Sequence, residues 1–197
     1  IYNLADTWFI ASTGDTALVA GVSLCAPVFT LMVAFSDIFG LGGSNLISRM
    51  LGRSSREEAS HVSAFCVYGA VGFGAVTGAV MIFLQDPILR LLGASAETMS
   101  YASSYYFWLA VGAPAIILNI VPGNLLRTEG LSENAMVCTI AGAVINIVLD
   151  PIFIFTFGMG AAGAALATVL SNVISDVFFL ITMKRKSEVL SIRIQDC

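Results

Sequence analysis

Four aspartates fall within long apolar stretches of the sequence: Asp6, Asp37, Asp150 and Asp176. A charged side chain in the middle of a membrane helix costs about 2.5–3.5 kcal/mol on insertion scales, so these four are candidates for chemistry and not for solubility. Carboxylate oxygens suit hard cations such as Na⁺, and a carboxyl group in apolar surroundings readily takes up a proton. The chemistry that these residues favour is therefore binding of a proton or of Na⁺.

Two of these aspartates share one depth. Asp6 lies eight residues before the turn at Gly14, and Asp150 lies eight residues before the turn at Gly158. At a rise of 1.5 Å per helical residue, both lie about 12 Å below the same end of their helices. Because no Lys or Arg occurs at that depth, a cation or a proton is the natural partner of the two carboxylates.

An amide and a hydroxyl belong to the same layer. Asn146 precedes Asp150 by four residues on one helix face, and Thr168 lies eight residues after Gly160 on the next helix. Alone, Asn146 and Thr168 would more often hold helices together through hydrogen bonds. Beside two carboxylates, they complete a candidate proton- or Na⁺-binding site formed by Asp6, Asn146, Asp150 and Thr168.

Three further polar residues are secondary candidates for the same chemistry: Asp37, Asn172 and Asp176. Asn172 and Asp176 extend a face of small and polar residues along the last apolar helix. Asp176 lies either in the interior or near the lipid headgroups, and Asp37 lies close to the end of its own apolar stretch.

Two prolines are predicted hinges. Pro151 directly follows Asp150, and Pro114 interrupts a long apolar stretch. Proline lacks a backbone N–H and clashes with the carbonyl group one turn earlier, so a helix bends there more easily. A bend beside Asp150 would couple the acid to a movement of the helix.

The composition excludes several classes of protein. Hydrophobic residues make up 57% of the 197 residues and charged residues 11%, whereas a soluble domain carries about 25% charge. With a mean hydropathy of +0.89, the chain does not fit a disordered protein, a nucleic-acid binder or a soluble enzyme.

The sequence contains no His cluster, no Gly-x-Ser-x-Gly and no HExxH motif. We expect no enzyme activity, no catalytic cofactor and no metal centre other than the Na⁺ alternative.

The elements that position the candidates are predicted to be membrane helices, which makes the chain an all-α, multi-pass protein of the cell membrane. A span needs about 20 apolar residues. The predicted helices cover residues 1–11, 16–51, 57–84, 96–126, 134–157 and 161–183. The first is expected to be truncated, since the sequence opens at Ile1 inside an apolar stretch. Eight of nine basic residues then fall on one side, the cytoplasmic side, and only Arg90 on the other.

The motifs resemble those of the N-terminal lobe of MATE (multidrug and toxic compound extrusion) transporters, in particular their bacterial drug-exporter branch. The most specific are Asn146-Ile147-Val148-Leu149-Asp150-Pro151 and the run from Gly160 to Thr168. The resemblance spans residues 2–186. The other matching pieces are Ala5-Asp6-Thr7, Gly42-Gly43, Ile47-Ser48-Arg49, Gly52, Leu92-Gly93-Ala94, Gly112-Ala113-Pro114, Leu126-Arg127 and Gly130.

This resemblance implies a fold, a site and an activity. It implies a twelve-helix exporter of two six-helix lobes, with residues 1–186 as the first lobe and 187–197 as the start of a cytoplasmic linker to a missing second lobe. The family pattern of a cation or proton site falls on Asp6, Asn146, Asp150 and Thr168. The implied activity is antiport of cationic, partly apolar drugs against H⁺ or Na⁺, within the lipid bilayer and without nucleic acid.

Two other functions compete with this expectation. A lipid-linked oligosaccharide flippase of the same superfamily would usually line its cavity with Arg, and no Arg lies deep in the predicted membrane helices. A membrane protein that does not transport would not need two acids at one depth.

Overall fold

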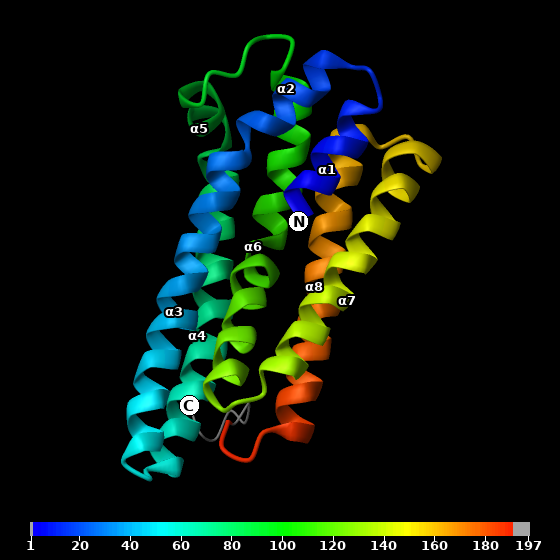
Figure 1. The fold of residues 1–197 in the computed structure, drawn as a ribbon. Helices are drawn as coiled ribbons and strands as arrows, with labels where there is room; N and C mark the ends of the chain where they lie inside the picture. Colours follow the sequence, from blue (N-terminus) through cyan, green and yellow to red (C-terminus); the bar gives the residue numbers. More distant parts are fainter. Residues whose placement is uncertain (1, 191–197) are drawn as a thin grey trace.

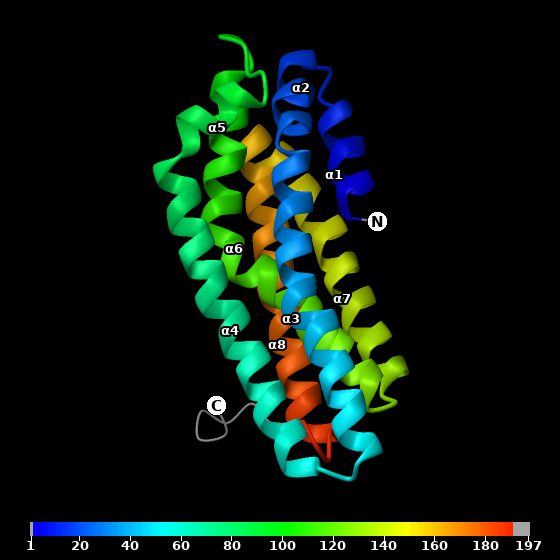
Figure 2. The same ribbon diagram turned by 90° about the vertical axis from the view of Figure 1, so that its left-hand side faces the viewer.

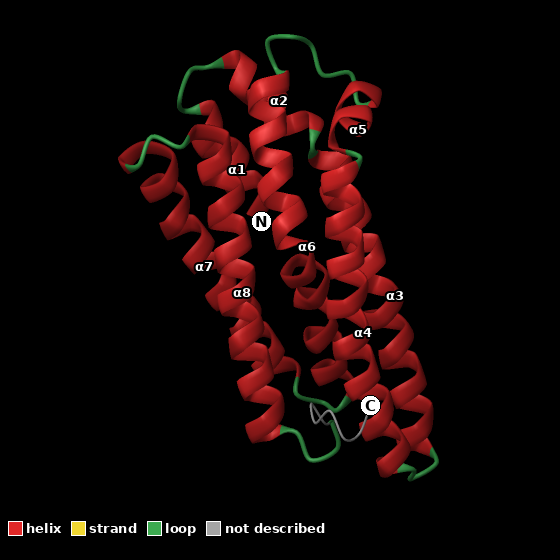
Figure 3. Ribbon diagram, turned by 180° about the vertical axis from the view of Figure 1, so that it is seen from behind, coloured by secondary structure: helices red, strands yellow, loops and turns green. Residues whose placement is uncertain are grey.

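The computed structural model describes residues 2–190, with side chains from Thr7 onward, and this part is helical without a strand (Figure 3), which confirms the all-α prediction. Five stretches are long and apolar enough to cross a membrane. The helices, drawn in Figure 1, are α1 (Tyr2–Ala11), α2 (Thr16–Leu24), α3 (Ala26–Gly52), α4 (Arg56–Phe83), α5 (Gln85–Leu91), α6 (Met99–Thr128), α7 (Ser132–Pro151), the π-helical η1 (Ile152–Thr156) and α8 (Gly160–Lys186).

The second predicted helix is divided in two. Residues 16–51 were expected to form one helix, but α2 ends at Leu24 and α3 begins at Ala26. Pro27 stands in the first turn of α3, where its missing N–H would have no helical partner. The proline therefore starts a new helix below Cys25, and the apolar pattern alone does not show the break.

Two other helix ends differ from the prediction. The connection after residue 84 contains the short helix α5, and α6 begins at Met99 and not at residue 96. At the other end of the chain, α7 ends at Pro151 and η1 follows it without a gap. In η1 the N–H of Phe157 donates to the carbonyl oxygen of Ile152 at 3.0 Å, a five-residue spacing. Such π-helical turns occur often at functional sites.

Helix α6 is the centre of the bundle. It packs against α3, α4 and α8, and Figure 2 shows it behind α3 and beside α4. Small residues let the backbones come close: a Cβ added at Gly74 of α4 would lie 2.6 Å from the Cα of Pro114 in α6. Close approach of this kind is how membrane helices gain packing energy.

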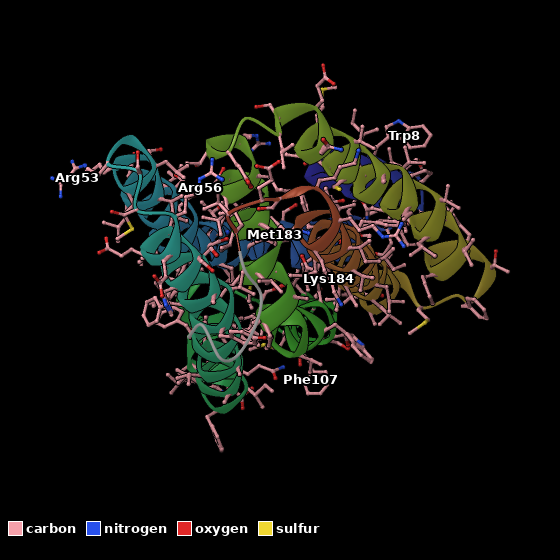
Figure 4. The ribbon with its side chains drawn as sticks, turned by 90° about the horizontal axis from the view of Figure 1, so that it is seen from below. Trp8, Arg53, Arg56, Phe107, Met183 and Lys184 are labelled. Atoms are coloured by element: carbon pink, nitrogen blue, oxygen red, sulfur yellow. The ribbon has the colours of Figure 1, made fainter. Side chains whose placement is uncertain are left out.

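The basic residues gather at one end of the bundle, which we name the basic end. It comprises the α3–α4 turn, the α6–α7 turn and the last turn of α8, with Arg49, Arg53, Arg56, Arg127, Lys184, Arg185 and Lys186. Viewed from this end, Arg53 projects away from the bundle, and Trp8 and Phe107 lie on its periphery (Figure 4). Arg193, which we also expected here, lies outside the described residues.

A short strap follows α8 and returns beneath the bundle. The hydroxyl of Ser187 donates to Glu129 Oε2, and the N–H groups of Glu188 and Val189 donate to Glu129 Oε1 at 2.7 and 3.0 Å. The N–H of Leu190 in turn donates to Ser187 Oγ at 2.7 Å, and the Leu190 side chain is buried. One carboxylate at the end of α6 thus holds residues 187–190 in place.

Candidate cation-binding site

The register of α7 against α8 decides which of their polar residues meet. Ser175 Oγ donates to the carbonyl oxygen of Cys138 at 3.5 Å, and Cys138 Sγ lies 3.4 Å from Thr182 Oγ1. Because the two helices run antiparallel, these contacts place Asp150 opposite residues 163–170 of α8, a range that contains Thr168. Asn146 likewise lies opposite residues 167–174.

Asn146 and Asp150 form a buried pair on α7. Both side chains are fully buried, with 0% exposed, and Asn146 Nδ2 donates to Asp150 Oδ1 at 3.2 Å. The spacing of four residues on one helix makes this bond possible. The amide oxygen of Asn146 is buried and accepts no hydrogen bond from the described residues. It is therefore an oxygen that a cation or a water molecule can use.

Thr168 and helix α1 complete the surroundings of this pair. Thr168 is buried on α8. Helix α1 packs against both α7 and α8, and it lies beside their upper halves in Figure 1. The Asp6 backbone belongs to α1, but its side chain lies outside the described residues. Thus α1, α7 and α8 meet at one level of the bundle, and the convergence of all four predicted ligands stays a prediction.

The two predicted hinges lie in different surroundings. Pro151 is the last residue of α7 and precedes the π-helical turn, so the irregular backbone begins one residue after Asp150. Pro114 lies inside α6, against Gly74 of α4. A role in movement stays a prediction for both.

A second polar cluster lies deeper in the bundle, toward the basic end. Asn119 Nδ2 of α6 donates to Asp176 Oδ1 at 3.0 Å, and it lies 3.4 Å from the carbonyl oxygen of Asn172. Asn172 and Asp176 are each 5% exposed. The structure therefore places the Asp176 side chain in the interior of the bundle. Sequence reasoning missed Asn119, although it is an amide between two prolines of an otherwise apolar stretch.

Asp37 does not belong to the buried Asn146–Asp150 pair. It is half-buried on α3, which packs against α4 and α6. Its neighbour Ser36 donates a hydrogen bond to the carbonyl oxygen of Ile117 in α6 at 2.6 Å. The Asp37 side chain makes no hydrogen bond or ion pair with the part of the chain that the structure describes.

The donor set suits a hard cation or a proton. Among the described side chains, no group of three or more His, Cys, Asp or Glu residues is placed to hold a metal ion. Cys25, Cys66 and Cys138 are buried free thiols. What α7 and α8 do offer is a carboxylate, amide oxygens and hydroxyls, the ligands of Na⁺ or of a shared proton.

Comparison with known proteins identifies relatives of this fold. The MatE family model matches residues 1–152. The multidrug export protein MepA of Staphylococcus saprophyticus is 35% identical over 191 residues, which are 97% of this chain and 42% of that protein. An inward-facing and an outward-facing structure of a multidrug resistance MATE family transporter superpose with TM-scores of 0.92 and 0.91. Both are 34% identical, over 99% of this chain and 44% and 43% of theirs.

Three conclusions follow from these comparisons. The chain is a multi-pass protein of the cell membrane, since its five membrane-length helices belong to the fold of known membrane transporters. It also spans less than half the length of the relatives that it matches. A single arrangement of the helices fits neighbours in both the inward-facing and the outward-facing state.

Proposed function

The chain belongs to the MatE family, and from this premise we propose that it forms the N-terminal lobe of a secondary antiporter that exports cationic, partly apolar drugs in exchange for H⁺ or Na⁺. The observation that carries the proposal is the fully buried pair of Asn146 and Asp150 in a membrane helix. The names of the relatives, which are multidrug export and multidrug resistance proteins, agree with the direction and the kind of cargo. The proposal is for transport and not for catalysis.

The charge of the pair explains how exchange would work. A buried carboxylate is costly in a membrane and favours a positive partner. No Lys or Arg occurs in α7, and those of α8 are confined to its last turn. Asp150, acting with Asn146 and with the predicted ligands Asp6 and Thr168, would thus be neutralised in turn by the ion and by the cationic drug. Binding of one lowers the affinity for the other, which couples the two movements.

The cycle has four steps. From outside, Asp150 takes up a proton or Na⁺, and the helices near Pro151 and Pro114 rearrange. The drug loses its acidic surroundings and leaves to the outside. The site then opens inward and the ion departs to the cytoplasm. The recharged carboxylates attract the next drug cation, and a membrane potential of 100 mV supplies about 2.3 kcal/mol for each net positive charge moved inward over the whole cycle.

The test is the substitution Asp150→Asn in the natural gene product that contains this chain. Asparagine keeps the size and a hydrogen-bond acceptor but cannot carry a charge, so we expect ethidium efflux from cells to fall to the background rate. Membrane levels should stay equal to those of the wild type. Asp86→Asn is the matched control, because Asp86 is an exposed acid at the start of α5, and its efflux should be unchanged. Full efflux by Asp150→Asn would refute the coupling role.

A further inference from the structure

A buried polar stripe runs along α8 from the level of Asp150 toward the basic end. Its members are spaced three, four, seven and eight residues from the first, which places them on one helix face. None is more than 5% exposed. Buried polar groups in a membrane helix are costly and mark pathways of ions or protons. The stripe consists of Thr168, Ser171, Asn172, Ser175 and Asp176.

The far end of the stripe is a carboxylate with a fixed partner. Asn119 Nδ2 faces two acceptors, Asp176 Oδ1 at 3.0 Å and the carbonyl oxygen of Asn172 at 3.4 Å. Because both neighbours are acceptors, the end of the Asn119 amide that faces them must be the one that carries the N–H groups. A Na⁺ ion needs oxygens around it, whereas here an N–H donor occupies one carboxylate oxygen. The arrangement suits a proton, because Oδ1 accepts from Asn119 whether or not Oδ2 carries a hydrogen.

Asp176 lies halfway along the part of α8 that leads from Thr168 to the basic end. Asp176 lies eight residues after Thr168 and eight residues before Lys184, so each step along α8 is about 12 Å. That distance is too long for one hydrogen bond and needs polar groups between. The side-chain amide of Asn172 makes no hydrogen bond within the described part of the chain. Asn146, which lies opposite this stretch of α8, has a buried amide oxygen without a described donor. Both amides can bind water along the path.

We propose that Asp176 is the inner proton acceptor of the transport cycle, held in position by Asn119. The inference rests on the proposed function with H⁺ as the coupling ion. The proton that leaves Asp150 passes along water, the Asn172 amide and the hydroxyls of the stripe to Asp176 Oδ2. It then leaves for water at the basic end, which restores the carboxylate. Asp176 thus carries the proton but not the drug.

The experiment uses the complete gene product in liposomes, with ethidium as the substrate and an imposed pH gradient. Asp176→Asn should lower the rate of transport about 100-fold, the low end of what a positioned proton-transfer group contributes. The dissociation constant for ethidium should stay the same, since the drug does not meet Asp176. Asp176→Glu, which keeps a carboxyl group, should retain part of the rate.

Ser36→Ala is the matched control, because it also removes a buried polar contact with α6. Ser36 Oγ donates to the carbonyl oxygen of Ile117 in that helix. The transport rate of Ser36→Ala should equal that of the wild type. A wild-type rate for Asp176→Asn would overturn the inference, and so would an equally slow Asp176→Glu. If transport by the wild type ignores the pH gradient, the proposed coupling to H⁺ fails first, independently of Asp176.

Discussion

Asp15 ties three segments together at the end of the bundle opposite the basic end. Its Oδ1 accepts from the N–H groups of Ala17 and Leu18 at 2.9 and 3.2 Å, which caps helix α2. Its Oδ2 accepts from the Tyr101 hydroxyl of α6 at 3.0 Å. The Leu18 N–H, followed by the Tyr101 hydroxyl, lowers the pKa of the Asp15 carboxyl. The carboxylate therefore favours the folded state wherever it is ionised.

This contact predicts a pH-dependent stability. Because the pKa of Asp15 is lower when the protein is folded, its contribution is complete above the unfolded pKa of about 3.9 and is lost as the pH falls through the folded value. Asp15→Asn keeps an acceptor oxygen but not the charge. We expect a lower melting temperature for Asp15→Asn than for the wild type at pH 7, and the same temperature for both well below pH 4. A gap that persists in acid would contradict the role of the charge.

Individual site residues differ in how well the sequence predicts them. The bond between Asn146 and Asp150 follows from a spacing of four on one helix, and the shared level of Thr168 follows from counting residues to a turn. Asn119 does not follow in this way. Helix α6 is buried on several sides, so its apolar pattern has no single face, and the crossing with α8 alone decides that Asn119 meets Asp176. The side chain of Asp6 lies outside the described residues.

Helices α4 and α6 show packing that depends on the absence of a side chain. Gly74 lies against the Pro114 backbone, which cannot move aside as a side chain can, whereas a Cβ at Gly72 on the same helix would meet nothing within 4 Å. The two glycines are two residues apart on one helix. Gly74 faces α6, whereas Gly72 faces open space. The need for glycine at position 74 therefore comes from the nearby α6 backbone. A glycine elsewhere on α4 does not by itself indicate such a contact.

Substitution of the two glycines tests this difference. Gly74→Leu should reduce the free energy of unfolding by about 1–3 kcal/mol, the usual cost of an overpacked core, because α4 and α6 must move apart. Gly72→Leu should leave the packing intact. Thermal unfolding of the purified variants in detergent measures both. Equal losses of stability in the two variants would show that contact with α6 does not explain the effect of Gly74→Leu.

The ends of helices could be predicted where glycines mark the turns between them. They could not be predicted at a proline, which can either lie inside a helix or begin one. Gly14, Gly130 and Gly158 have positive φ angles of 75°, 86° and 64° and lie in turns between helices, as the sequence indicates. Pro27 was expected inside a helix, but it begins one. Sequence patterns do not separate these cases, because the choice depends on how α2 and α3 each pack against α6.

The whole molecule is asymmetric in charge along its long axis. Seven described Lys and Arg residues lie at the basic end, and Arg90 in α5 lies toward the other end. Retention of positive loops in the cytoplasm sets the orientation of such a bundle. The basic end is therefore predicted to face the cytoplasm.

Labelling of single cysteines tests this orientation in cells. The native thiols of Cys25, Cys66 and Cys138 are buried, so they should give little background once Cys197 is replaced by Ser. Ala96→Cys should react with a membrane-impermeant maleimide added outside, whereas Ser132→Cys should react only after the membrane is opened. Both positions are exposed. The reverse pattern would invert the proposed path of the proton and of the drug.

The strap at Glu129 determines where a mechanical force enters the bundle. Ser187, Glu188 and Val189 donate hydrogen bonds to Glu129 at the end of α6, so tension on the chain beyond Leu190 would reach the α6–α7 turn before it reached the last turn of α8. Helix α7 begins at that turn and carries Asp150 near its far end. A pull from the cytoplasmic side would thus act along the helix that holds the buried carboxylate, with Glu129 as its point of attachment.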